Sequence, residues 1–337
     1  MGAVIPLKKE INNCYIELKN LVGDKLDYVS QHIKIKLASE INLIHKMTNY
    51  HLDSGGKRIR TLLTLGTAKL CGYKDGSRDI NLAACIELIH NATLLHDDVI
   101  DNSNLRRGIK TSNSIWGNQS SILVGDYLLG RCFEMMVEDG STEILKLLSS
   151  TSSRIAQGEV LQLEHKGKIN ILEETYFNII NMKTAVLFAA ATKLGACITN
   201  KNKKEKDALE SYGKNLGLAF QIADDTLDYF ATGSNFGKEI GKDFYEGKTT
   251  LPLIIIFQKS NTEEKNFLIE IFNKKKRNED DFSETLALIN KYKAVQVSFK
   301  KAQYFVNVSY DALRIFDDNK EKRILQNLTK FSLNRSF

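Results

Sequence analysis

Apolar residues recur at intervals of three and four positions through most of the chain. The spacing is seen in Leu62 and Leu65 and again in Ile86 and Ile89, and it places apolar side chains on one face of an α-helix. Apolar and polar residues do not alternate between tight turns as they would in a β-sheet. Only two prolines interrupt the pattern, Pro6 and Pro252. The pattern predicts an all-α protein.

Segments rich in glycine, asparagine, aspartate and serine separate the predicted helices. They lie at 53–56, 72–77, 102–108, 139–142, 167–170, 200–206 and 232–247. None has the composition of a linker between domains, and no sequence repeat of fixed period occurs. We therefore expect a single domain over residues 1–337, a length at which core size is not limiting.

Two aspartate clusters with identical spacing stand out, and each closes an apolar helical pattern. The first comprises Asp97, Asp98 and Asp101, and the second comprises Asp224, Asp225 and Asp228. On an α-helix the first and third residues of such a cluster lie about one turn apart on one face, with the second about 100° around. Each like-charge pair destabilises a helix by about 0.2–0.5 kcal/mol, so a cation is expected to compensate.

The two acidic motifs together indicate magnesium and a diphosphate. Mg²⁺ takes one or two carboxylates and completes its coordination with water and substrate phosphate oxygens, and the looped ligand set of a calcium site is missing here. A single cluster is more often a solvated helix end. Two copies, each on an apolar helix, favour a diphosphate clamped between them through Mg²⁺.

Basic residues beside the acidic motifs suit the same anionic ligand. The segment Gly55-Gly56-Lys57-Arg58-Ile59-Arg60 is expected to open a helix, with Lys57 and Arg60 on one face and free backbone N–H groups favouring an anion. His90 lies two turns before Asp97, where it could reach a phosphate, although a satisfied core histidine is the alternative. Further basic residues flank the motifs, and any one alone would more often be surface charge: Arg106, Arg107, Lys183, Lys238 and Lys248.

Composition and charge narrow the class of protein. Apolar residues make up 42% and charged residues 26% of the chain, as in globular proteins. The net charge of +6 is scattered, so it suits an anionic ligand without requiring nucleic acid. The five cysteines are far apart, which favours a reducing compartment over a disulfide framework. The first nine residues reverse the order of a secretory signal, and the longest apolar run, 251–257, is too short to span a bilayer.

The sequence resembles the trans-polyprenyl diphosphate synthases over nearly its full length, most closely the bacterial long-chain, octaprenyl type. The family's motifs occur in order as GGKRIR (55–60), LLHDDVIDNSNLRRG (94–108), GKNLGLAFQIADDTLD (213–228) and GKDFYEGKTTLP (241–252). Two positions depart from the family pattern. Thr61 replaces a usual proline, and Lys242 stands where an acidic residue is common before Asp243.

The resemblance implies a bundle of the isoprenoid-synthase type around a central apolar cavity. It also implies condensation of isopentenyl diphosphate with an allylic diphosphate such as farnesyl or geranylgeranyl diphosphate, with Mg²⁺ as cofactor. The diphosphate of isopentenyl diphosphate would be held by Lys57, Arg60, His90 and Arg107. The allylic diphosphate would face Arg106, Lys183, Lys238 and Lys248. The leading magnesium ligands would be Asp97, Asp101 and Asp224, supported by Asp98, Asp225 and Asp228. Oxygen dipoles near the allylic cation would come from Thr184 and Gln221.

Product length is expected to depend on the residues below the first acidic motif. Ala92 and Thr93 are small, where short-chain members of the family carry bulky aromatics, so an open tunnel is expected there. Phe133 and Met136, on the predicted helix 125–137, would form its floor. Small residues at helical spacing are equally consistent with ordinary close packing. We expect octaprenyl diphosphate, with solanesyl and decaprenyl diphosphate as longer possibilities.

Three alternatives compete with this interpretation. A geranylgeranyl-type synthase would favour large residues at 92 and 93, a non-catalytic partner subunit could lose motif aspartates, and a terpene cyclase would not need a second diphosphate site. From the resemblance we expect a homodimer in the cytoplasm, with no transmembrane segment, that supplies quinone biosynthesis. Product release is expected to involve peripheral contact with a membrane.

Overall fold

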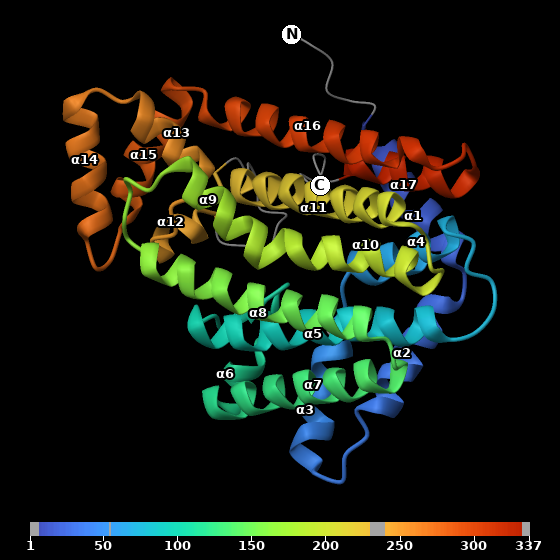
Figure 1. The fold of residues 1–337 in the computed structure, drawn as a ribbon. Helices are drawn as coiled ribbons and strands as arrows, with labels where there is room; N and C mark the ends of the chain where they lie inside the picture. The colour runs from blue at the N-terminus through green and yellow to red at the C-terminus, as the bar shows by residue number, and fades with distance from the viewer. Residues whose placement is uncertain (1–6, 54, 230–239, 332–337) are drawn as a thin grey trace.

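The computed structural model describes residues 7–53, 55–229 and 240–331 of the chain (Figure 1). These residues form an almost entirely helical bundle, which confirms the all-α prediction. Its helices and strands, in chain order, are α1 (Leu7–Val22), α2 (Lys25–Lys36), α3 (Asn42–Asp53), α4 (Ile59–Leu70), α5 (Arg78–Ile100), β1 (Leu105–Arg106), β2 (Ile109–Lys110), α6 (Ser112–Trp116), α7 (Asn118–Asp139), α8 (Thr142–His165), α9 (Glu173–Ile180), the π-helix η1 (Asn181–Ala185), α10 (Val186–Ile198), α11 (Lys203–Leu227), α12 (Lys242–Glu246), α13 (Leu251–Lys259), α14 (Thr262–Asn273), α15 (Glu279–Lys291), α16 (Ala294–Ala312), the 3₁₀-helix η2 (Leu313–Ile315) and α17 (Lys320–Phe331).

The helices pack in layers around α10 and α11. In Figure 1, α16 covers α11 from one side, while α8 and α5 lie on the other side of α10 and α7 lies beyond α5. Helix α10 also packs against α4, so it is surrounded by helices. The short helices α13, α14 and α15 gather at one end of the bundle, beside α12. This arrangement brings the C-terminal ends of α5 and α11 to the same end of the molecule.

Local sequence signals explain why α11 begins and packs as it does. Its N-terminus has a capping box, in which the Asn202 side chain accepts from the Glu205 backbone and the Glu205 side chain accepts from the Asn202 backbone. Its buried face follows at helical spacing through Leu209, Leu216 and Ile222, which are 2% exposed or less. The helix therefore presents one apolar face to the bundle while its last turn carries the second acidic motif.

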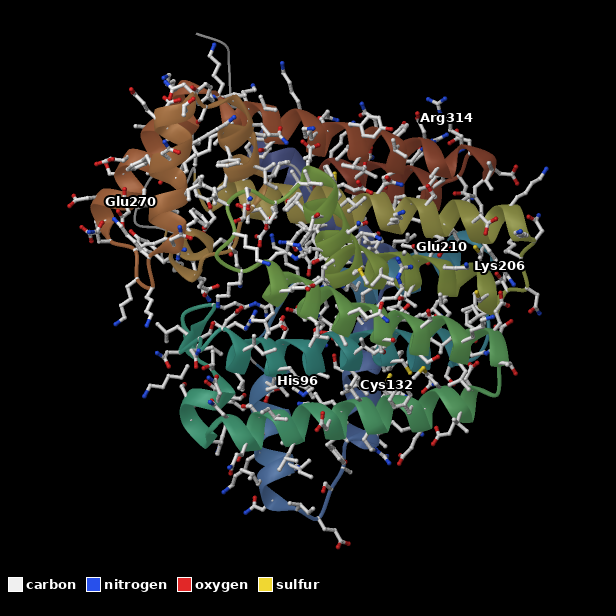
Figure 2. The ribbon with its side chains drawn as sticks, turned by 60° about the vertical axis from the view of Figure 1, so that its left-hand side comes forward. His96, Cys132, Lys206, Glu210, Glu270 and Arg314 are labelled. Atoms are coloured by element: carbon white, nitrogen blue, oxygen red, sulfur yellow. The ribbon has the colours of Figure 1, made fainter. Side chains whose placement is uncertain are left out.

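The core consists of two clusters of buried apolar side chains. The larger is built mainly by α1, α4, α5, α7 and α10, and the smaller by α9, α11 and the helices α13 to α16. Charged side chains such as Glu270 and Arg314 project from the outer faces, whereas Cys132 lies inside (Figure 2). The expectation of one domain over residues 1–337 remains a prediction.

Two of the predicted breaks contain structure that the sequence pattern did not show. The break at 102–108 includes most of a β-hairpin, in which Arg106 pairs with Ile109 and Arg107 and Gly108 form the turn. Both turn residues have positive φ, 56° and 79°, as a type I′ turn requires. The break at 232–247 contains α12, and its first part lies outside the described residues. Across the described ranges, every helix is too short or too polar to cross a membrane.

Candidate active site

Both acidic motifs lie in the last turn of a long helix, as their spacing predicts. Helix α5 ends at Ile100 and is followed by Asp101 as its C-cap, and α11 ends at Leu227 and is followed by Asp228 in the same role. Three carboxylates therefore meet the negative end of the helix dipole at each site. This arrangement is unfavourable without positive charge nearby.

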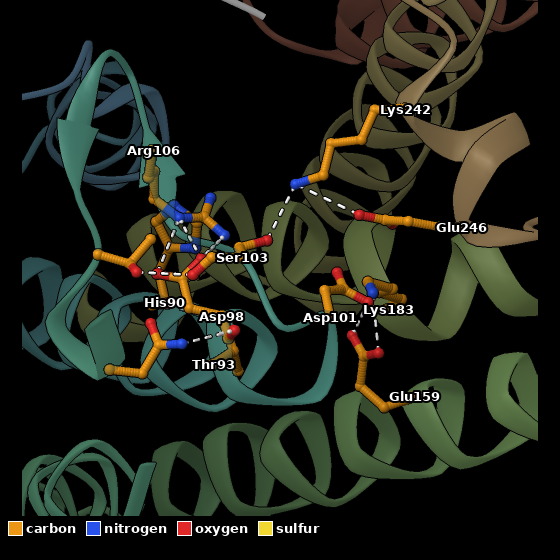
Figure 3. Close-up of polar contacts among 12 residues, drawn as sticks. His90, Thr93, Asp98, Asp101, Ser103, Arg106, Glu159, Lys183, Lys242 and Glu246 are labelled. Carbon is orange, nitrogen blue, oxygen red and sulfur yellow. Dashed lines mark hydrogen bonds and ion pairs between the residues drawn. The ribbon is translucent and has the colours of Figure 1, made fainter. Parts of the chain in front are cut away.

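An arginine from the adjoining hairpin and lysines from distant segments face the first motif (Figure 3). The Asp98 carboxylate, which is buried, accepts a hydrogen bond of 2.9 Å from Arg106 Nε and lies 2.8 Å from Arg106 Nη2. Asp101 Oδ2 lies 2.9 Å from Lys248 Nζ, which reaches it from the segment after α12. Burial alone would raise the pKa of Asp101, but Lys248, Lys183 and Lys242 outweigh that effect and hold it below its usual value.

Lys183 is placed beside the same motif by the π-helix η1. Its ammonium group lies 2.6 Å from Glu159 Oε1 and 2.9 Å from Gln162 Oε1, both on α8. Helix α8 approaches closely because residue 158 is glycine: a Cβ there would lie 2.8 Å from the backbone nitrogen of Lys183. Burial raises the pKa of Asp97 to about 7, against the opposing charge of Lys183. Asp97 therefore gains a proton near neutral pH unless another cation approaches it.

In the second motif, Asp225 is held by neutral hydrogen-bond donors. Asp225 is buried and accepts hydrogen bonds of 2.7 Å from the Tyr176 hydroxyl and from Gln221 Nε2. The Thr184 hydroxyl donates to Gln221 Oε1 at 2.8 Å, so the two predicted oxygen dipoles belong to one network. Burial and the nearby charge of Asp243 raise the pKa of Asp225 to about 8, although Tyr176 and Gln221 oppose the shift.

Helix α12 connects the two motifs. The backbone N–H of Asp243 donates to Asp228 Oδ2 at 3.0 Å, and that of Gly241 donates to the Asp228 carbonyl at 3.0 Å. Beyond the helix, Lys248 contacts Asp101 of the first motif. The short segment 241–248 is thus fastened to the end of α11 and to the end of α5.

A second basic group gathers around His90. Arg60 Nη1 lies 3.1 Å from His90 Nε2, and the Arg60 guanidinium stacks 4.5 Å from the centre of the Phe188 ring. Burial and the charge of Arg60 lower the pKa of His90 well below its ordinary value, so His90 is neutral. Arg107 donates to the Gly55 carbonyl, and glycine at 56 leaves room for it because a Cβ there would lie 2.6 Å from Arg107 Nη1.

The prediction that Lys57 and Arg60 share a helix face is wrong. Helix α4 begins at Ile59, because Arg58 before it adopts the left-handed conformation, with φ 46°, and so cannot be part of the helix. Lys57 therefore precedes the helix and is exposed. Residue 238 lies outside the described residues, so the placement of Lys238 stays a prediction.

The residue that replaces the usual proline, Thr61, has a clear structural role. Its hydroxyl donates a hydrogen bond of 2.5 Å to Glu87, and both side chains are buried. A buried carboxylate requires hydrogen-bond partners, and threonine supplies one that proline could not. This departure therefore supports the packing of α4 against α5.

The residues predicted to set product length differ in their exposure. Ala92 and Met136 are buried at 0% and 1% exposure, and the Thr93 hydroxyl donates to the His90 carbonyl at 2.8 Å. Phe133 is 42% exposed on α7 and points away from the interior of the chain. Phe133 therefore does not form the floor of a cavity within a single chain, because it lies on the outward face of its helix.

Four residues near the motifs were missed by sequence reasoning. Glu159 and Gln162 lie one turn apart on α8, a polar pair that could have signalled a shared ligand. Tyr176 has no motif around it. His51 lies near Asn91. Burial and the positive charges of Arg106 and Arg107 lower the pKa of His51 to about 4.

The carboxylates fit a metal ion that is shared with substrate better than one caged by protein. Within the described ranges, no group of three or more histidine, cysteine, aspartate or glutamate side chains is placed to hold a metal ion. The donors are carboxylate oxygens at the ends of two helices, and burial of Asp97 penalises its charge when no cation is near. Mg²⁺ accepts such a set when phosphate oxygens and water complete its coordination.

The fold and this site define a class of protein. Residues 41–289 match the model of the family described as "Polyprenyl synthetase". The chain belongs to the polyprenyl synthetase family and is a trans-prenyltransferase, a trans-polyprenyl diphosphate synthase. Enzymes of this family use isopentenyl diphosphate and allylic diphosphates as substrates.

Several relatives with long-chain products match this chain over most of its length. It is 34% identical to the octaprenyl diphosphate synthase of Haemophilus influenzae, covering 98% of this chain and 100% of that protein. It is 42% identical to the octaprenyl diphosphate synthase of Escherichia coli, covering 71% and 73% of the two chains. Among solved structures, a decaprenyl diphosphate synthase from Rhodobacter capsulatus matches at 36% identity with a TM-score of 0.91, covering 96% of this chain and 99% of that one.

Proposed function

We propose that the chain is an octaprenyl diphosphate synthase that extends an allylic diphosphate with isopentenyl diphosphate and requires Mg²⁺. The observation that carries the product length is the fully buried Ala92, five residues below Asp97 on α5, where a bulky side chain would limit the growing chain. The names of the Haemophilus influenzae and Escherichia coli relatives support the same length.

The allylic diphosphate is proposed to lie between the two acidic motifs. Asp97, Asp101 and Asp224 would hold Mg²⁺, which supplies positive charge to the leaving diphosphate. Lys183, Lys248 and Arg106 would contact its oxygens. The charged groups of Arg106 and Lys183 already lie against Asp98 and Glu159 (Figure 3), and that of Lys248 lies against Asp101. Cleavage of the allylic C–O bond separates charge, so fixed cations at this position lower its barrier.

Isopentenyl diphosphate is proposed to bind the second basic group, formed by Lys57, Arg60, Arg107 and the neutral His90. The oxygens of Thr184 and Gln221 would face the allylic cation, since their hydrogen-bonded chain ends at the second motif. After the new C–C bond forms, a proton must leave the product. Neutral His90 lies against Arg60 and is proposed to bind phosphate. The released diphosphate is proposed to be the base that accepts this proton.

A homodimer formed through α7 is proposed for the complete enzyme. Helix α7 carries large apolar side chains on its outward face, including Leu123 and Val137 at 67% and 65% exposure and Phe133 at 42%. A second copy would remove this surface from water. In the same proposal, the enzyme is cytoplasmic and its product supplies the side chain of a quinone.

Product analysis tests this function directly. Purified protein is incubated with Mg²⁺, farnesyl diphosphate and labelled isopentenyl diphosphate, and the extracted products are separated by chain length. We expect an all-trans ladder that ends at eight units and is abolished by a chelator. A ladder that stops at four units would replace the octaprenyl assignment with a shorter-chain one. Absence of incorporation by folded protein would favour a non-catalytic subunit.

A further inference from the structure

Lys242 is the first residue of α12, and its side chain reaches across to the side of the site that carries the first motif (Figure 3). Its ammonium group donates to the Ser103 hydroxyl at 2.9 Å and lies 3.4 Å from Glu246 Oε1. Ser103 is buried in the loop between Asp101 and the hairpin that carries Arg106. The Lys242 charge is therefore held at a fixed point beside the first motif, although it comes from the segment after the second.

A linear chain of ion pairs leads from Lys242 to Asp101. Glu246 Oε2 lies 2.7 Å from Lys248 Nζ, and Lys248 in turn lies 2.9 Å from Asp101. Asp243 also acts on Lys248, so three carboxylates face these two lysines. Lys242 adds the second of the two positive charges, and without it Lys248 alone would oppose the carboxylates of this chain.

We propose that Lys242 makes diphosphate binding by this enzyme partly independent of magnesium. Its ammonium group, held in place by Ser103 and Glu246, supplies positive charge that a neutral or acidic side chain at 242 would lack. The inference rests on the proposed placement of the allylic diphosphate beside Asp101 and Lys248. It goes further by dividing the neutralisation of that diphosphate between the metal and a residue of the chain.

Calorimetric titration with inorganic diphosphate tests the proposal without relying on turnover. The full chain, stripped of metal on a chelating resin, is titrated first without and then with saturating Mg²⁺. We expect the metal-free affinity to fall about tenfold in Lys242→Met and further in Lys242→Asp. With saturating Mg²⁺ the difference between wild type and Lys242→Met should shrink to about threefold, because the metal then supplies most of the charge.

Two further variants separate the local effect from general changes. Lys300→Asp, at an exposed position on α16, changes the net charge by the same amount as Lys242→Asp and should leave the metal-free affinity within about twofold. Ser103→Ala removes the hydroxyl that holds the ammonium group and should weaken metal-free binding by about threefold. Circular dichroism checks folding, and Lys242→Met decides if Lys242→Asp does not fold.

The outcomes that overturn the inference differ from those that overturn the proposed site. Equal metal-free affinity of wild type and Lys242→Met would remove the role of Lys242 while leaving the site intact. An equal loss in Lys300→Asp would assign the effect to net charge alone. If wild type bound no diphosphate even with Mg²⁺ and formed no product, the proposed site itself would be wrong.

Discussion

The two acidic motifs have the same residue spacing, but Asp101 of the first and Asp225 of the second have different electrostatic surroundings. In the first, Asp98 faces Arg106 and Asp101 faces Lys248, so these two carboxylates are matched with cations. In the second, Asp225 is held by the neutral Tyr176 and Gln221, and burial raises its pKa to about 8. Identical spacing therefore predicts where carboxylates gather but not what charge they carry. We infer that Asp101 contributes more to charge neutralisation and Asp225 more to positioning.

The largest expected difference lies between Asp101→Asn and Asp225→Asn. Asp101 is held in its charged form by Lys248, so its loss should lower kcat/KM on the order of a thousandfold. Asp225 is already prone to protonation near neutral pH, so Asn should cost only about tenfold. Initial rates of isopentenyl diphosphate incorporation at saturating Mg²⁺ measure both. Equal losses would contradict the contrast between the motifs.

The next comparison concerns the helices that carry the motifs. Ala92 on α5 and Ala219 on α11 each lie five residues before the first aspartate of their motif, and both are 0% exposed. We expect Ala92→Leu to shorten the product by one or more isoprene units, because the added side chain blocks the path below Asp97. Ala219→Leu adds the same volume and should lower stability without shortening the product. Chain-length analysis of extracted products distinguishes them, and shortening by both variants would argue against a path along α5 alone.

A smaller effect is expected from Tyr176→Phe. The change removes one donor to Asp225, which should raise the pKa of that carboxyl further and lower kcat about tenfold. Tyr212→Phe is the matched control, because the Tyr212 hydroxyl donates to the Leu325 carbonyl at 2.8 Å in the core. Both variants should lose about 1 kcal/mol in urea unfolding, and only Tyr176→Phe should lose activity. Unchanged kcat in Tyr176→Phe would remove Tyr176 from the site.

The smallest effect is a pH dependence of stability on the side of the first motif. The pKa of His51 is about 4 in the folded protein and near its usual value of 6.5 when unfolded. The unfolded chain therefore binds more protons between these values, so the His51 contribution is complete above pH 6.5 and is lost as the pH falls toward 4.

Replacing His51 should flatten this dependence. Between pH 7 and pH 5, the free energy of unfolding of His51→Asn should fall by about 1 to 2 kcal/mol less than that of wild type. His45→Asn, at an exposed position on the same helix, should behave as wild type does. Urea unfolding at the two pH values measures the difference, and parallel losses in all three proteins would exclude His51 as the cause.

The helices, their breaks and the position of the two motifs could be predicted from sequence because they depend on local periodicity. The direct contacts of the motif residues could not all be predicted, because some join distant segments: Lys248 is 147 residues from Asp101, and Tyr176 is 49 residues from Asp225. The hairpin at 105–110 was missed because two-residue strands are too short to show alternation. The orientation of Phe133 depends on which face of α7 its neighbours cover, and sequence spacing does not settle that.

The tight turn at Arg107 and Gly108 joins two residues that point to different parts of the site. It places Arg106 against Asp98 and directs Arg107 to Gly55, so consecutive residues would serve the two proposed diphosphate positions. Both turn residues have positive φ, and the β-strand pairing fixes the turn on either side. The backbone of the two arginines therefore moves as one unit. If binding at one position shifts the turn, the other position shifts with it, and by reciprocity each substrate should then alter the affinity of its partner by the same factor.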